Sequence, residues 1–169
     1  MQTYERSVRV DAPLSSVWEF HSTTDGLEAL TPSWMNMRIR EVRGPDGTAD
    51  PDVLDVGAVV RVSIRPFDVG PTQEWTSEIT ARESVDGSAY FQDVMTDGPF
   101  EQWEHTHLFY ADDNQTIVRD RIAYELPLGA VGRVLGPLGV VGFEPMFRYR
   151  HRRTKELLES ESHQSQTCQ

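Results

Sequence analysis

Two histidines and two aromatic residues stand on alternate positions of one short segment, and their side chains could do chemistry. His105 and His107 are two residues apart, and Trp103 and Phe109 each lie two positions outside them. Side chains along a β-strand alternate between its two faces, so on a strand all four share one face. The two bulky aromatics indicate that this face points inward. A buried imidazole there can move protons, orient a ligand or bind a metal ion.

A second segment adds a carboxylate and a phenol to the same pattern. Asp120 and Tyr124 share strand parity with the apolar Ile122. If the two segments are antiparallel neighbours, the inner face carries both histidines, the carboxylate and the phenol in an apolar setting. Buried polar groups must be hydrogen-bonded, so these four satisfy one another, a ligand or trapped water. In a purely structural alternative, Asp120 only fixes the tautomer of His105.

Other residues of the same parity, and one face of a C-terminal helix, extend this inner surface. The predicted ligand-binding residues are Trp75, Phe91, Asp93, Met95, Trp103, His105, His107, Phe109, Asp120, Ile122, Tyr124, Phe143 and Phe147. If the protein is an enzyme, the predicted catalytic residues are His105, His107, Asp120 and Tyr124.

The order of sequence patterns predicts the elements that must position these side chains. An alternating strand near the N-terminus is followed by two short helices between Asp11 and Pro32. Six further alternating strands, separated by turn sequences, are expected at 34–42, 58–67, 73–83, 88–95, 101–110 and 116–126. An apolar stripe from Phe143 to Leu158 predicts a long helix from about residue 140 to 160. The expected class is α+β, with a curved seven-stranded antiparallel sheet wrapped around the C-terminal helix.

Length and composition bound the remaining possibilities. The 169 residues suffice for one domain, expected over 1–160, with a polar and disordered tail over 161–169. No apolar run reaches the ~18 residues of a membrane span, and no signal peptide is visible, so a cytoplasmic location is expected. The net charge of −11 argues against a nucleic-acid partner. We expect a monomer or weak homodimer. The basic run that includes Arg150 and His151 is expected to be a solvated, ion-paired face of the helix.

The whole pattern resembles the SRPBCC, or START-like, superfamily with its helix-grip fold. The likeness spans roughly residues 3–158 and is most specific in the stretch FQDVMTDGPFEQWEHTHLF and in RDRIAYELPLG. The positions that match the polyketide cyclase/dehydrase-like subgroup are Gly98, Pro99, Phe100, Trp103, His105, His107, Phe109, Asp120, Tyr124 and Pro127. The resemblance implies a ligand cavity between the sheet and the C-terminal helix. The fold hosts binders, transporters and enzymes, so it does not name an activity.

Three functions remain open for such a cavity. The first is binding of a small hydrophobic ligand, lipid-like or polyketide-like, without chemistry. The second, implied by the resemblance to polyketide cyclases, is a cyclase or dehydrase in which Asp120 orients a histidine base and Tyr124 stabilises an enolate. The third is a metal-dependent enzyme that uses both histidines with Asp120 or Asp93. No phosphate-binding loop, nucleophile elbow or paired-cysteine motif is present. The favoured expectation is ligand binding with no cofactor and no metal.

The charge pattern generates a prediction about salt. Fifteen arginines stand against the single Lys155, within an excess of acidic residues, which is typical of proteins from high-salt cytoplasm, although a GC-rich genome also replaces Lys by Arg. Screening relieves acid–acid repulsion, and the Debye length falls to about 3 Å at molar salt. We expect the melting temperature to rise from low to molar potassium chloride, measured by scanning calorimetry. A flat or falling melting temperature would remove the halophilic interpretation.

Overall fold

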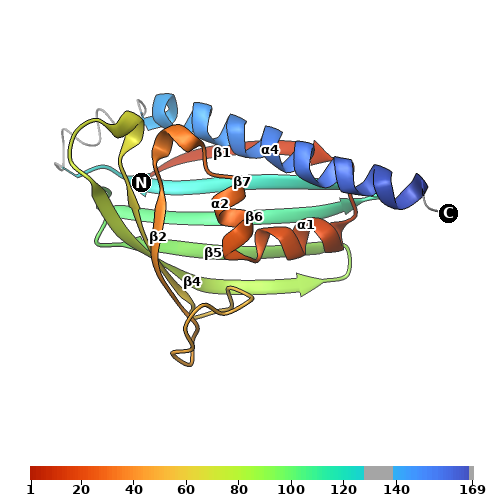
Figure 1. The fold of residues 1–169 in the computed structure, drawn as a ribbon, viewed down its shortest axis with the longest axis horizontal. Helices are drawn as coiled ribbons and strands as arrows, with labels where there is room; N and C mark the ends of the chain where they lie inside the picture. Colours follow the sequence, from red (N-terminus) through yellow and green to blue (C-terminus); the bar gives the residue numbers. More distant parts are fainter. Residues whose placement is uncertain (128–138, 168–169) are drawn as a thin grey trace.

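The protein folds as a single curved antiparallel sheet that encloses helices on its concave side (Figure 1). The computed structural model describes residues 1–127 and 139–167, with only the backbone of residues 139–142 and 161–167. The seven strands are β1 (Gln2–Val10), β2 (Arg38–Arg43), β3 (Val59–Ile64), β4 (Gln73–Val85), β5 (Ser88–Thr96), β6 (Gln102–Asp112) and β7 (Gln115–Glu125). Their order in the sheet is β1-β7-β6-β5-β4-β3-β2. This confirms the α+β class and the seven-stranded sheet.

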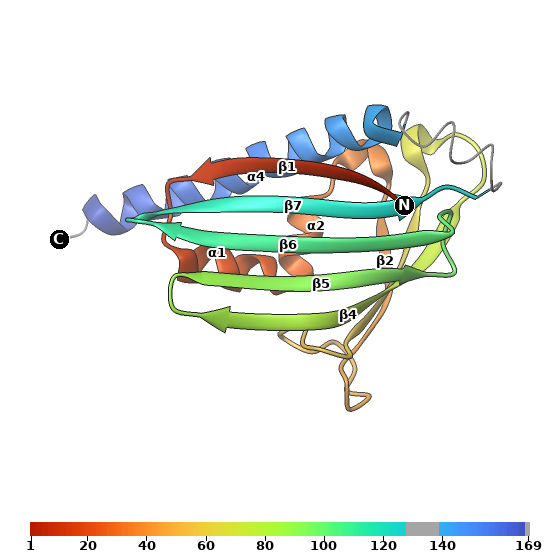
Figure 2. The same ribbon diagram turned by 180° about the vertical axis from the view of Figure 1, so that it is seen from behind.

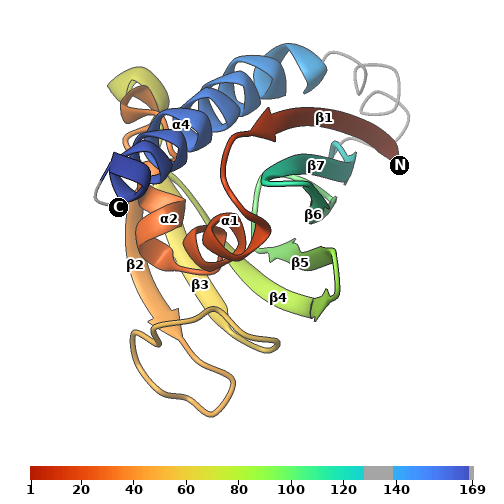
Figure 3. The same cartoon turned by 90° about the vertical axis from the view of Figure 1, so that its right-hand side faces the viewer.

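Three α-helices and two short 3-10 helices complete the described part of the chain. They are α1 (Leu14–His21), α2 (Thr24–Ala29), η1 (Ser33–Met35), η2 (Pro66–Asp68) and α4 (Gly139–Thr167). The view along the strands shows the sheet curling from β1 round to β2, with α1, α2 and α4 on its inner side (Figure 3). From behind, the outer face of β1, β7, β6, β5 and β4 is seen without a covering helix (Figure 2). This is the helix-grip arrangement that the element order predicts.

Two strands differ from the expected bounds by three residues or more, for local reasons. The strand expected over 34–42 starts only at Arg38, because Ser33–Met35 form η1 after Pro32 and Asn36 adopts a left-handed conformation. The strand expected over 58–67 ends at Ile64, because Pro66 starts η2. Tight turns occur where expected: β4 and β5 meet through Asp86-Gly87, with Gly87 at a φ of 77°.

Helix α4 is held along β1 by polar contacts and against the sheet by aromatic rings. Tyr4 Oη donates to Glu144 Oε2 at 2.7 Å, and the same carboxylate accepts from Arg6. Farther along the helix, Lys155 Nζ donates to the carbonyl oxygen of Arg9 at 2.8 Å. The buried residues of α4 are Phe143, Phe147, His151, Thr154 and Leu158, which fall on one helical face. The helix continues to Thr167, beyond the end expected near residue 160 and into the predicted tail; residues 168–169 lie outside the described part.

The inward-facing positions form two adjoining apolar clusters. One contains Val10, Val17, Phe109 and Val118 and extends over β3 and β4, and the other gathers Tyr4, Tyr124 and Phe147 beneath α4. The parity predicted from the sequence is therefore correct for β6 and β7. No helix of the described residues is long and apolar enough to cross a membrane.

Candidate functional site

A cavity of about 490 Å³ lies between α4, the α1–α2 region and the concave face of β3, β4, β5 and β6. Its walls are mostly aliphatic, aromatic and Met side chains. Nine of the predicted ligand-binding residues line it: Trp75, Phe91, Asp93, Met95, Trp103, His105, His107, Phe143 and Phe147. Because the polar residues of this set come from the middle of β5 and β6, the cavity has one polar side in an otherwise apolar wall.

The remaining four predicted residues share the inner face but lie beneath the cavity wall. Phe109, Asp120, Ile122 and Tyr124 are each buried and are not among the lining residues. Tyr124 packs edge-on against Phe143 at a ring separation of 4.9 Å, so α4 separates it from the cavity. Phe109 is covered by Trp18 and His21 of α1. A group that stabilises an enolate must line the cavity in which the substrate binds. Tyr124 does not line the cavity, so the role expected of it does not fit its position.

Strand register brings the polar side chains together. Asp93 on β5 pairs with His105 on β6, and Asp120 on β7 pairs with His107 on β6. Cross-strand neighbours and their diagonal neighbours are within contact distance on one face of a sheet. The two carboxylates therefore flank the two imidazoles, one on each side.

Asp120 is the centre of this arrangement. Its Oδ1 accepts a hydrogen bond from His105 Nε2 at 2.9 Å, and its Oδ2 accepts one from His151 Nε2 at 2.6 Å. His107 Nδ1 lies 2.8 Å from Asp120 Oδ1, an ion-pair distance, but without the alignment of a hydrogen bond. We call Asp120 with His105, His107 and His151 the Asp120 cluster. All four residues are at least nine-tenths buried, so the cluster links β6, β7 and α4 in the protein interior.

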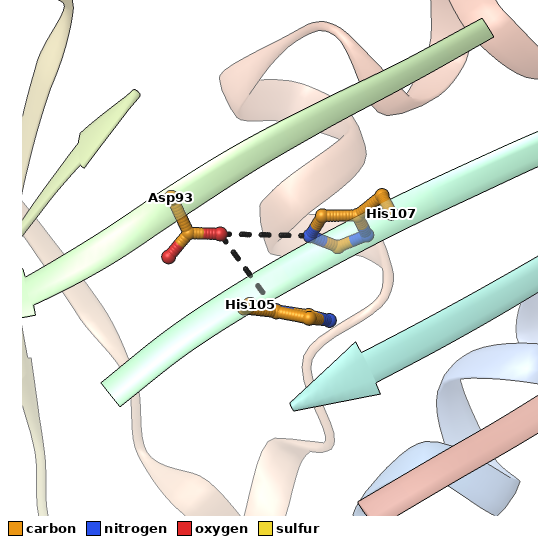
Figure 4. A group of neighbouring side chains, drawn as sticks. All are labelled: Asp93, His105 and His107. Atoms are coloured by element: carbon orange, nitrogen blue, oxygen red, sulfur yellow. Dashed lines mark ion pairs between the residues drawn. The ribbon is translucent and has the colours of Figure 1, made fainter. Parts of the chain in front are cut away.

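The second ring nitrogens of the two strand histidines face Asp93. His105 Nδ1 lies 3.7 Å and His107 Nε2 lies 3.6 Å from Asp93 Oδ1 (Figure 4). Both distances exceed the usual 2.7–3.2 Å of a hydrogen bond, about half an ångström too long for direct pairing. The other carboxylate oxygen, Asp93 Oδ2, accepts a hydrogen bond from Ser77 Oγ at 2.9 Å. Asp93 is therefore held from behind, with Oδ1 presented to both imidazoles.

Burial and charge set the protonation of the site. Burial acts to raise the pKa of Asp120, but the three histidines outweigh it and hold that pKa well below its usual value. In the same way, His107 and His105 outweigh burial and lower the pKa of Asp93. Burial and the charge of His107 lower the pKa of His105. For His107 burial acts to lower the pKa, but Asp120 and Asp93 outweigh it and the pKa is raised. Both carboxylates are therefore ionised, and of the two strand histidines His107 takes up a proton more readily than His105.

Three functional positions were missed by the sequence interpretation. His151 and Arg150 were expected in a solvated basic run, but His151 is buried in the Asp120 cluster and Arg150 lines the cavity. The expectation was wrong for His151 because one face of α4 points into the protein whatever the charge of its neighbours. His21, at the end of α1, also lines the cavity, and burial lowers its pKa to about 3. Its Nδ1 donates to the carbonyl oxygen of Val17 at 2.8 Å, so it is a neutral ring.

A second hollow, of about 610 Å³, lies near the β2–β3 edge and contains Arg38, Arg40 and Arg65. It is larger than the first but does not include either strand histidine. Its arginines are already engaged in part: Arg40 Nε donates to Ser63 Oγ at 2.9 Å, and Arg65 Nε donates to the carbonyl oxygen of Gly70 at 3.0 Å. We therefore take the cavity with the histidines as the candidate site.

The sequence matches the model of one protein family over residues 8–158, described as a domain of unknown function, DUF8410. The chain belongs to the DUF8410 family. The match covers β2 to β7, the last residues of β1 and the part of α4 that carries His151. A comparison with curated protein sequences gave no match.

Solved structures similar to this DUF8410 protein confirm the fold. Norcoclaurine synthase from Thalictrum flavum, in complex with dopamine and hydroxybenzaldehyde, is 16% identical, with a TM-score of 0.63 over 94% of this chain and 87% of that one. Ara h 8.0201 is 15% identical, with a TM-score of 0.56 over 90% and 97% of the chains. A Thermus thermophilus protein is 19% identical, with a TM-score of 0.62 over 95% and 99%. The likeness confirms the helix-grip fold, while membership of the START-like superfamily and of its cyclase/dehydrase-like subgroup stays a prediction.

The Asp120 cluster makes a strong prediction about the stability of this DUF8410 protein. Replacing Asp120 by Asn keeps the shape of the side chain but removes the charge that accepts from the histidines of β6 and α4. Removing one partner of a buried ionic contact costs about 3–5 kcal/mol. We expect Asp120→Asn to lower the free energy of unfolding by about that amount in urea denaturation. The control Asp86→Asn, at an exposed turn position, should leave it unchanged within about 0.5 kcal/mol. An Asp120→Asn protein as stable as the control would contradict the cluster.

Proposed function

We propose that the protein binds a small hydrophobic molecule that carries an oxygen-containing polar group. The observation that supports this most is the cavity of about 490 Å³ with apolar walls and one polar side. Small-molecule sites typically enclose about 300–1,000 Å³ and combine apolar lining with a few convergent polar groups. The apolar part of the ligand would contact residues such as Leu27, Val62 and Phe147, which line the cavity.

The polar side of the cavity favours a ligand with a carbonyl, carboxylate or phenolate oxygen. His105 and His107 each offer an imidazole edge there, and Arg150 on α4 adds a guanidinium. Burial lowers the pKa of Arg150, which reflects the cost of holding this cation away from water. No carboxylate of the residues that the structure describes lies at ion-pair distance from it. An anionic oxygen of a bound ligand would supply the missing acceptor.

Acid–base catalysis is a second candidate, favoured by one specific contact. Asp120 accepts from His105 and lies beside His107, so it orients two imidazoles whose free edges face the cavity. A positioned imidazole contributes typically 10²–10⁴-fold to a proton-transfer step. A fold of the same type binds two aromatic molecules in the norcoclaurine synthase complex with dopamine and hydroxybenzaldehyde. A cyclase or dehydrase of polyketide-like substrates would use His105 and His107 in this way, without Tyr124.

The remaining features of the proposed function concern where and with what the protein works. We propose a cytoplasmic protein, monomeric or a weak homodimer, whose partner is the small ligand and not a nucleic acid. A carrier of lipid-like molecules and a halophilic origin are consistent with the cavity and with the net charge of −11.

Blocking the cavity tests the binding function. Leu27 on α2 lines the cavity, whereas Asp25 on the same helix is exposed and lines neither hollow. Trp at position 27 fills space that a ligand needs. We expect Leu27→Trp to weaken binding of the fluorescent probe anilinonaphthalene sulfonate at least tenfold, and to lose any small molecule that native mass spectrometry detects on the wild-type protein. Asp25→Trp should behave as wild type. Equal probe binding by both variants, with both folded by circular dichroism, would contradict the proposed cavity.

A variant at the polar side separates a binder from an enzyme. With binding as the function, polyketones and hydroxy-ketones incubated with the protein stay chemically unchanged, and His107→Ala still binds the probe, with weaker affinity. Mass spectrometry of the incubated ketones gives the result directly. Conversion of a ketone that falls by about 10²–10⁴ in His107→Ala, with affinity little changed, would replace binding by the acid–base function.

A further inference from the structure

We propose that Asp93, His105 and His107 bind a divalent transition-metal ion at the polar side of the cavity. Nitrogen and oxygen ligand atoms of these three side chains all lie within 4.8 Å of one another. The favoured sequence-based expectation assigned no metal to the protein, and a metal-dependent enzyme that uses both histidines with Asp120 or Asp93 was one of the three functions left open. The proposal deepens the proposed function, since the ion would meet the polar group of the ligand, but it rests on contacts of its own.

The distances from Asp93 to the two histidines fit ligands that share one metal ion better than they fit direct hydrogen bonds. Asp93 Oδ1 is 3.6 Å from His107 Nε2 and 3.7 Å from His105 Nδ1, too far for hydrogen bonds. Zn²⁺ binds imidazole nitrogen and carboxylate oxygen at about 2.0–2.2 Å, which separates two ligands of a tetrahedral ion by roughly 3.4 Å. The two distances from Asp93 Oδ1 lie within about 0.3 Å of this separation, so Asp93 is placed to share an ion with either histidine (Figure 4).

The tautomers also present the correct atoms. His105 Nε2 donates to the ionised Asp120, so in the neutral ring the lone pair is on Nδ1, the atom that faces Asp93. His107 Nδ1 is the ring nitrogen beside Asp120, which leaves Nε2 facing Asp93. Two imidazole lone pairs and a carboxylate oxygen converge, and without a cation or a proton between them they would repel one another.

Each of the three ligands is held from behind by a group that would not touch the ion. Asp120 accepts a hydrogen bond from His105, lies at ion-pair distance from His107, and also accepts from His151 of α4. Ser77 Oγ donates to the remaining oxygen of Asp93 at 2.9 Å. Metal-binding histidines characteristically donate their other ring nitrogen to a carboxylate, which fixes the tautomer and the orientation of the ring. The arrangement therefore includes the supporting contacts of a metal site as well as the ligands.

The side of the site toward the cavity stays open to further ligands. All three residues line the cavity, and the set of two imidazoles and one carboxylate is typical of zinc and non-haem iron sites that leave positions for substrate. Those positions would take an oxygen of a carboxylate, carbonyl or phenolate. Asp93 and Asp120 together balance a divalent ion, so Arg150 remains as the cation that favours an anionic ligand.

The experiment is a titration of the chelator-treated, tag-free protein with Zn²⁺ alone by isothermal calorimetry, and with Co²⁺ by visible absorption. We expect one ion per chain and a Co²⁺ spectrum of nitrogen and oxygen ligands. Asp93→Asn and His107→Ala should raise Kd by more than about 100-fold, beyond the 10–100-fold typical for loss of a supporting group. Ser77→Ala, which keeps all three ligands, should fall within that 10–100-fold range, and Asp86→Asn should bind as wild type.

The outcomes separate this proposal from the hydrophobic-ligand function. Probe binding to the metal-free protein tests the cavity by itself, so retained probe binding without Zn²⁺ binding contradicts the metal site alone. Zn²⁺ that binds Asp93→Asn and His107→Ala as tightly as wild type is bound elsewhere, and this also overturns the proposal. If Asp93→Asn unfolds, His107→Ala and the milder Ser77→Ala give the answer, since an unchanged Kd in both folded variants contradicts the site.

Discussion

The buried carboxylate of Asp120 is the contact on which the geometry of the site depends. It accepts from His105 on β6 and from His151 on α4, and it lies at ion-pair distance from His107. An ionised carboxylate in a protein interior is tolerated only when its oxygens are satisfied by donors. His105 on β6 and His151 on α4 supply these donors, one to each oxygen, and His107 adds an ion-pair contact. The same contact therefore docks the C-terminal helix on the sheet and fixes which ring nitrogens remain for the cavity.

The rest of the site follows from this constraint. With one edge of each strand histidine held by Asp120, the other edge faces Asp93, whose carboxylate is positioned by Ser77. Phe91 stacks on His107 at a ring separation of 4.1 Å, and Phe147 packs edge-on against His105 at 5.3 Å. These contacts restrict rotation of both imidazole rings. Such rigid orientation suits ligand binding, proton transfer and metal coordination alike. The proposals above differ only in what occupies the space beside Asp93.

The sequence predicts the face of each strand well and the position of the cavity less well. Alternation along β6 and β7 placed His105, His107 and Asp120 on the inner face because strand parity depends only on local geometry. Whether an inward residue lines a cavity or lies beneath its wall depends on where α4 crosses the sheet. Tyr124 and Ile122 are therefore buried under the helix, a result that parity cannot give. For His151, the basic neighbours in the sequence concealed its place on the buried stripe, four residues after Phe147 and three before Thr154.

The most direct test of the role of Asp120 is to determine which ring nitrogen of each histidine carries the proton. Long-range proton–nitrogen NMR of the metal-free protein at alkaline pH distinguishes Nδ1–H from Nε2–H in each ring. We expect the proton on Nε2 in His105 and in His151, because both Nε2 atoms donate to Asp120. Loss of this preference in Asp120→Asn would assign it to the carboxylate. An Nδ1–H tautomer at His105 in the wild-type protein would contradict the account, since the lone pair would then point at Asp120 and not at the cavity.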